Sequence, residues 1–130
     1  MAVSLNHTIV HSRDPAAGAR FLSEVLGLAE PKRFGPFLVV EADNGVSLDY
    51  MQVGEDVSPN HYAFLVGEDE FDVIFARLQE RGITYYADPH AHQAGEINTH
   101  DGGRGCYFAD PDGHWLEIIT RPYGSGSGSA

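Results

Sequence analysis

Apolar and polar residues alternate or recur along this chain in patterns that predict two similar blocks, each with strands and one helix. Residues 3–11 alternate as in a half-buried strand, with His7 on one of its two faces. Asp14 and Pro15 then begin a helix, because Asp caps free N–H groups and proline loses no hydrogen bond at the first helical position. Gly27 is the expected C-cap of this helix.

A hairpin is predicted after the first helix. Residues 37–41 and 46–53 suit strands, and the Asp-Asn-Gly sequence at 43–45 between them is a strong hairpin signal. Residues 31–35 contain turn formers and are expected to be a connection. Residues 54–60 are also turn formers, so we expect the first block to end there.

The second block repeats this order. It begins with an apolar strand at residues 61–66, and the acidic residues 68–70 favour the first turn of a following helix. Apolar residues spaced i, i+3, i+4 and i+7 from Phe71 to Leu78 give that helix its buried face. The remaining predicted segments are a short strand at 83–87, a long polar loop at 88–105, and strands at 104–109 and 115–120 joined by a turn.

The two blocks are copies of one unit of a strand, a helix and three strands. His7 corresponds to His61, and residues 44–49 and 112–117 both read Asn/Asp-Gly-x-x-Leu-Asp/Glu. Such duplication predicts pseudo-symmetry and a site built from equivalent positions. The predicted fold is therefore α+β, with two tandem βαβββ modules at about residues 3–53 and 60–122.

Length and composition limit the possible functions. The 130 residues, 42% of them apolar, predict one domain at residues 1–122, followed at 123–130 by a flexible Gly-Ser tail or added linker. The lack of a long apolar run and of a signal-peptide pattern predicts a cytoplasmic protein without a membrane partner. A formal net charge of −11 argues against nucleic acid as a partner. One cysteine, Cys106, excludes an intrachain disulfide and a cysteine-based zinc site.

Four polar side chains at equivalent places are candidate metal ligands: His7 and His61 on the first strands, Asp49 and Glu117 on the last. Glu117 stands among apolar residues, where a carboxylate must be paired or metal-bound to avoid a large desolvation cost. Two imidazoles with one or two carboxylates suit iron, zinc, manganese or nickel. Each residue alone is more simply a hydrogen-bonded strand residue, and their coincidence at duplicated positions favours the metal. Asp49 has a further interpretation, as a general base or as a residue that orients a ligand.

The sequence at residues 105–117, Gly-x-Tyr-Phe-x-Asp-Pro-Asp-Gly-x-x-x-Glu, with two modules that each begin near a histidine, resembles the vicinal oxygen chelate superfamily. This superfamily includes glyoxalase I, methylmalonyl-CoA epimerase, extradiol dioxygenases, fosfomycin-resistance enzymes and bleomycin-resistance proteins. The resemblance spans roughly residues 3–122.

The resemblance implies a cup-shaped, largely antiparallel sheet around a divalent metal. His7, His61 and Glu117 fall on its ligand positions. Asp49 falls where glyoxalases and epimerases have Glu or Gln as a fourth ligand, and its shorter side chain departs from that pattern. The resemblance also implies a homodimer, and in some members the two modules of one site come from different chains.

Several activities remain open on this basis. A metal that binds a small oxygenated substrate through two oxygens suits a lyase or isomerase, with Asp49 or Glu117 as the base. It equally suits an extradiol-type dioxygenase with iron. Fosfomycin-type addition is a third option, although Lys32 is the only lysine available to hold a phosphonate. The alternative from another class is a metal-free drug-binding protein of the bleomycin-resistance kind, whose cationic ligand would suit the acidic charge.

Other residues near the motif are weaker candidates. Tyr107 is a candidate acid or hydrogen-bond donor to substrate, with a packed strand aromatic as the simpler interpretation. Arg104 and His100, near the end of the long loop, are candidates for substrate binding. Their simpler interpretation is as a surface arginine and a solvent-exposed histidine. Cys106 has no obvious activating base and is interpreted as a packing residue.

Overall fold

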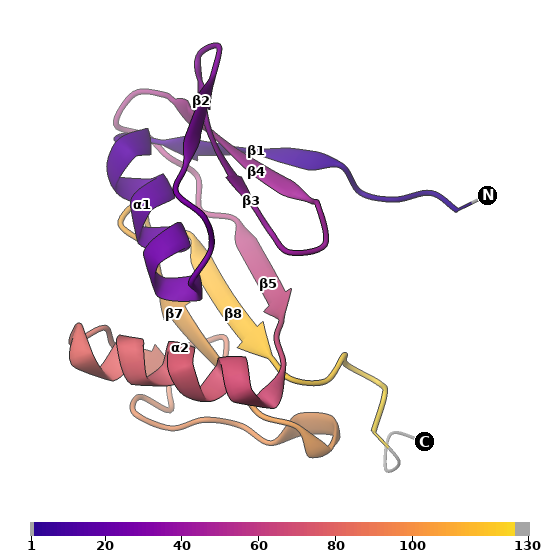
Figure 1. The fold of residues 1–130 in the computed structure, drawn as a ribbon. Helices are drawn as coiled ribbons and strands as arrows, with labels where there is room; N and C mark the ends of the chain where they lie inside the picture. Colours follow the sequence, from indigo (N-terminus) through magenta and orange to yellow (C-terminus); the bar gives the residue numbers. More distant parts are fainter. Residues whose placement is uncertain (1, 127–130) are drawn as a thin grey trace. The chain divides into compact units, whose positions relative to one another are not determined.

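The chain forms two compact units, each with its own four-stranded sheet (Figure 1), in a computed structural model that describes residues 2–126. The first unit holds the residues up to Pro59 together with Asp110–Gly113. The second holds Asn60–Ala109 and the residues from His114 onward. No helix within residues 2–126 is long and apolar enough to cross a membrane.

The first unit has one strand before its helix and three after it. Its sheet order is β1-β4-β3-β2, with β1 parallel to β4 and the other two pairs antiparallel. Its elements are β1 (His7–Ser12), α1 (Pro15–Leu26), β2 (Lys32–Phe34), β3 (Phe37–Glu41) and β4 (Ser47–Gln52).

The second unit has the same order and the same pairing. Its sheet runs β5-β8-β7-β6, with β5 parallel to β8 and the other pairs antiparallel. Its elements are β5 (His61–Leu65), α2 (Glu68–Glu80), β6 (Tyr85–Tyr86), the short 3₁₀ helix η1 (His100–Gly102), β7 (Gly105–Ala109) and β8 (Trp115–Ile119). The predicted α+β fold of two βαβββ modules is thus confirmed, each module being a mixed sheet.

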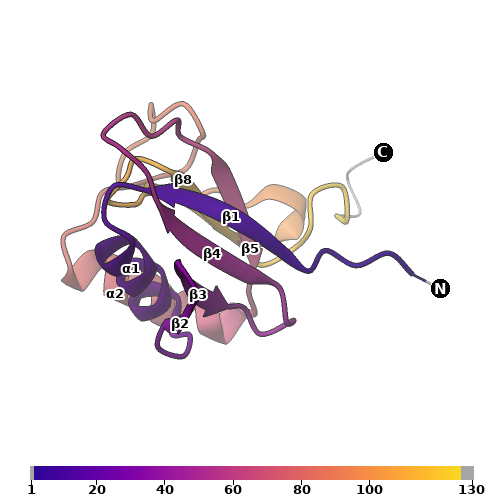
Figure 2. The ribbon, with the colours of Figure 1, turned by 90° about the horizontal axis from the view of Figure 1, so that it is seen from above.

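Helix α1 follows from local capping and from its apolar face. The Asp14 carboxylate accepts from the Ala17 amide at 3.3 Å, Pro15 begins the helix, and Gly27 ends it in the left-handed region at φ 74°. The helix lies against one face of the first sheet (Figure 2). Gly18 permits this approach, because a Cβ there would lie 3.1 Å from the Tyr50 ring.

One connection turned out to be a strand. Residues 31–35 were expected to form a turn-rich link, but Lys32–Phe34 is β2, paired antiparallel with β3. All three of its residues are exposed, so no apolar alternation signals it, and its hydrogen bonds to β3 define it instead. β1 also begins later than expected, at His7 rather than residue 3.

Candidate metal centre

Glu117 is a buried carboxylate at the centre of the second sheet. Its side chain is 1% exposed and lies opposite Ala63 on β5 and Tyr107 on β7. His61, two residues before Ala63, is on the same sheet face because side chains alternate along a strand. Its Nε2 lies 3.0 Å from Oε1 of Glu117, while about half of the imidazole remains exposed. A histidine and a carboxylate therefore meet at a place that solvent can reach.

The other nitrogen of His61 determines what this pair can bind. Its Nδ1 lies 2.9 Å from the backbone oxygen of Trp115. A carbonyl oxygen can only accept, so Nδ1 carries a proton and donates it. In the neutral ring, the lone pair of Nε2 then faces a carboxylate oxygen, and a cation or an added proton must lie between these two acceptors. Metal-binding histidines commonly donate their other ring N–H to a carbonyl oxygen, as Nδ1 of His61 does. The His61 nitrogen and the Glu117 oxygen are donor atoms that fit a divalent metal.

Two phenol groups complete the surroundings of Glu117. The hydroxyl of Tyr123 donates to Oε2 of Glu117 and lies 2.9 Å from the hydroxyl of Tyr107. Burial raises the pKa of the Tyr123 phenol, and its hydrogen bond to Glu117 raises that pKa further. Burial likewise raises the pKa of Tyr107. Both phenols therefore remain protonated at neutral pH. Because Tyr123 donates its proton to Glu117, Tyr107 is the donor to the Tyr123 oxygen.

The same sheet face is lined by aromatic rings. The Tyr107 ring stacks at 5.9 Å on the His61 imidazole and at 6.0 Å on Trp115. Tyr86, on β6, lies 5.5 Å from Trp115. These rings lie on the same sheet face as Glu117.

In the first unit, His7 and Asp49 occupy the equivalent positions. His7 pairs with Ser47 and Ile9 with Asp49, so the histidine lies two residues before the partner of the carboxylate, as in the second sheet. His7 is exposed, with Nδ1 2.7 Å from Oδ1 of Asn6. Asp49 Oδ1 accepts from the Ser47 hydroxyl at 2.9 Å. The strand register around His7 and Asp49 thus matches that around His61 and Glu117. The shorter Asp49 side chain, however, is hydrogen-bonded to Ser47 of its own strand.

Arg104 is held at the start of α2. Its guanidinium donates to the Glu68 and Asp72 carboxylates at 2.8 Å and lies 4.5 Å above the Phe71 ring. These hydrogen bonds raise the pKa of Arg104, with that to Asp72 contributing most. Its donors thus have partners within the fold, and substrate binding by Arg104 stays a prediction.

His100 lies closer to the candidate site. It begins η1 in the long loop, and its ring is 6.3 Å from that of Tyr123, whose hydroxyl binds Glu117. Its exposed imidazole therefore stays a candidate for substrate binding.

Tyr123 is the residue that sequence reasoning missed. Residues 123–130 were set aside as a flexible tail, yet Tyr123 is in contact with the carboxylate of Glu117. The one available signal was an aromatic residue immediately before the Gly-Ser run, and nothing in its spacing pointed to the site. Residues 127–130 lie outside the part of the chain that the structure describes.

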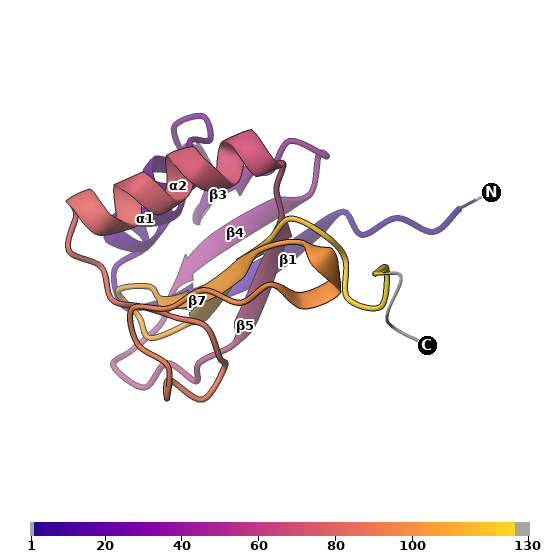
Figure 3. The same ribbon diagram turned by 90° about the horizontal axis from the view of Figure 1, so that it is seen from below.

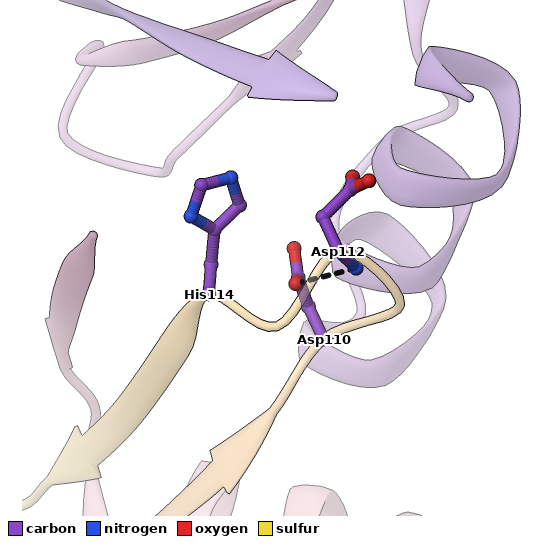
Figure 4. Close-up of side chains that lie close together, drawn as sticks. All are labelled: Asp110, Asp112 and His114. Atoms are coloured by element: carbon purple, nitrogen blue, oxygen red, sulfur yellow. Dashed lines mark hydrogen bonds between the residues drawn. The ribbon is translucent and has the colours of Figure 1, made fainter. Parts of the chain in front are cut away.

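A second group of potential ligands lies in the turn between β7 and β8. Ligand atoms of Asp110, Asp112 and His114 are within 4.8 Å of one another (Figure 4). Asp112 already accepts from Ser12 and from Arg13, and Nδ1 of His114 accepts from the backbone N–H of Asn60. These residues stabilise the turn and the start of β8, so we place the candidate site at Glu117.

Comparison with known proteins identifies the family. Residues 4–118 match the Glyoxalase/Bleomycin resistance protein/Dioxygenase superfamily. The chain belongs to this superfamily. The resemblance seen in the sequence, carried by the motif at residues 105–117, is therefore confirmed.

Two solved structures and one curated relative are similar over most of the chain. The structure of Oxidase ChaP-H1 is 64% identical, covers 95% of this chain and 99% of that chain, and has a TM-score of 0.92. Oxidase ChaP-H2 is 59% identical, with 98% and 100% covered and a TM-score of 0.94. Glutathione transferase FosA of Serratia marcescens is 33% identical over 125 residues, which are 91% of this chain and 81% of the relative.

Proposed function

We propose that this chain is a divalent-metal-dependent enzyme that binds a small oxygenated substrate and acts on it as an oxidase. The observation that carries the proposal is the His61–Glu117 pair, in which the Nε2 lone pair faces a buried carboxylate at 3.0 Å. His7 is proposed as the third ligand, because it holds the same place in its module as His61. The similarity to Oxidase ChaP-H1 at 64% identity supports the reaction class.

The protein's own groups would have distinct tasks in this enzyme. A bound metal with open positions would polarise a substrate oxygen and favour its deprotonated form. The Nδ1–H of His61 holds the imidazole in place through the Trp115 carbonyl, so that Nε2 points toward Glu117. Tyr107 is proposed as an acid or hydrogen-bond donor to a substrate oxygen, a role in which its proton turns from the Tyr123 oxygen to the substrate. Asp49 is proposed as a fourth ligand or as the general base.

Iron is the metal we expect for this activity. Two histidines and one carboxylate with open positions are typical of non-haem iron oxygenases. Zinc, manganese or nickel in the purified protein would instead favour a lyase, an isomerase or a transferase.

Thiol transfer is the second candidate, favoured by the 33% identity to Glutathione transferase FosA. The charges on this chain weigh against it. Lys32 is the only lysine, and the Arg104 guanidinium is bound to Glu68 and Asp72. The scarcity of lysine and the acidic partners of Arg104 thus weigh against a strongly anionic substrate.

Elemental analysis of the purified protein tests the metal site. We expect about one equivalent of metal per chain, lost in both His7→Ala and Glu117→Ala because each removes a proposed ligand. His92→Ala and Glu96→Ala, which replace exposed residues of the same types, should retain it. Unchanged metal content in both ligand variants would refute the site.

Oxygen consumption then tests the reaction class. The iron-loaded protein should consume oxygen when supplied with a catechol or hydroquinone, and the zinc-loaded protein should not. A protein that no divalent ion saturates in calorimetry would favour the metal-free drug-binding alternative.

A further inference from the structure

The segment after β8 is fastened to the loop between β6 and β7. The Asp101 carboxylate in η1 accepts from the backbone N–H groups of Gly124 and Gly126, each at 3.1 Å. Figure 3 shows η1 beside this C-terminal segment. The Ser125 amide also donates to the Pro122 carbonyl at 3.1 Å, which closes a turn. Two separate sets of bonds thus hold residues 122–126, a segment we call the C-terminal strap.

The strap places the Tyr123 phenol against the buried carboxylate of Glu117. The Tyr123 side chain donates to Oε2 of Glu117, although the residue as a whole is 53% exposed. Its hydroxyl is also held by that of Tyr107 at 2.9 Å. The two oxygens of Glu117 therefore have different partners, Tyr123 at Oε2 and His61 at Oε1.

We propose that Tyr123 is a positioning residue that occupies one oxygen of Glu117 and leaves the other, beside His61, for the metal. This inference rests on the proposed function, because it assigns Tyr123 a role at that same centre. A carboxylate can bind a metal through one or both of its oxygens. A donor fixed on Oε2 favours binding through Oε1 alone and keeps coordination positions free for a substrate. Hydrogen-bond partners of ligands typically contribute tenfold or more to metal affinity.

Replacement of the single hydroxyl tests the role. Tyr123→Phe keeps the ring, so we expect the fold to persist while the affinity of the apo-protein for Zn²⁺, measured by calorimetry, falls about tenfold. The cobalt-substituted variant should have weaker visible absorption than the wild type, because Glu117 then binds through both oxygens and the coordination number rises. Tyr85→Phe, which removes a hydroxyl from β6, is the matched control and should change neither quantity.

Asp101→Ala provides an independent arm, because it releases the strap without altering Tyr123. We expect Asp101→Ala to lower the Zn²⁺ affinity, as Tyr123→Phe does. Wild-type affinity in Asp101→Ala would show that the strap does not hold the phenol in place. Wild-type affinity and spectrum in Tyr123→Phe would overturn the positioning role. Tighter binding in that variant would also overturn it, because the phenol would then compete with the metal. A wild-type protein that binds neither Zn²⁺ nor Co²⁺ would refute the proposed function itself.

Discussion

Asp112 connects the turn after β7 to the end of β1 within the first unit. Its side chain is 4% exposed and accepts from the Ser12 hydroxyl at 2.6 Å and the Arg13 amide at 2.9 Å. Asp112→Ala leaves both donors without this acceptor, so we expect the free energy of unfolding to fall by about 2–4 kcal/mol. Urea denaturation measures the change, with Asp43→Ala in the exposed β3–β4 turn as the control. Equal midpoints for the two variants would contradict this structural role.

Cys106 is a second residue whose environment predicts its behaviour. It is fully buried in β7, and burial raises the pKa of its thiol from 9.0 to about 12. At pH 8 the thiolate fraction is then on the order of one in ten thousand, so the folded protein should resist a disulfide reagent. The unfolded chain should react with one equivalent. Rapid labelling of the folded protein at pH 8 would show that the thiol is accessible.

The raised pKa of Cys106 also predicts how the stability of the fold changes at high pH. The pKa of the Cys106 thiol is higher in the folded protein than in the unfolded chain. The buried neutral thiol therefore makes its full contribution to the free energy of unfolding below about pH 9. This contribution is lost as the pH rises from about 9 toward 12, where only the unfolded chain ionises.

The residues of the candidate site differ in how far the sequence could predict them. Glu117 was visible because a charged residue interrupts an apolar strand. Its contact with His61 depends on the parallel register of β5 and β8, which the sequence did not predict. Tyr123 lies outside both strands and reaches Glu117 through a turn whose partner, Asp101, is 22 positions earlier. No local pattern encodes a contact of that kind.

At the scale of elements, the N-cap of α1 gives a direct prediction. Asp14 accepts from the Ala17 amide, one of the free N–H groups of the first turn. Asp14→Ala should lower the free energy of unfolding by about 1 kcal/mol, the usual value of an N-cap. Asp56→Ala, at an exposed position outside the helices and strands, should have little effect in the same urea titration. Identical curves for both variants would show that the cap does not contribute.

Elements with their own local signals were predicted closely. The Asp-Pro start and Gly27 end of α1 match the structure, as does the hairpin of β3 and β4. β2 lacked such a signal because its residues are exposed on both faces. β6 is only two residues long, Tyr85 and Tyr86, and its pairing with β7 defines it more than its composition does.

For the whole molecule, a homodimer is an expectation that the surroundings of His7 favour. Leu5 and Ile9, which flank His7 on the same side of the alternating pattern, are 69% and 43% exposed. Large exposed apolar side chains beside a candidate ligand are typical of an interaction surface. A second copy that covers this strand would bury them, and a homodimer is accordingly our expectation.

A mixture of two inactive variants tests whether one site is shared between two chains. If His7 of one chain joins His61 and Glu117 of the other, a dimer of His7→Ala with Glu117→Ala has one site with all three ligands intact. Random re-association should then restore about a quarter of the wild-type metal sites, because half of the dimers are mixed and each has one of two sites complete. Metal content and oxygen consumption after co-refolding measure this. Each variant refolded alone should show neither, and a mixture that stays equally inactive would place all three ligands within one chain.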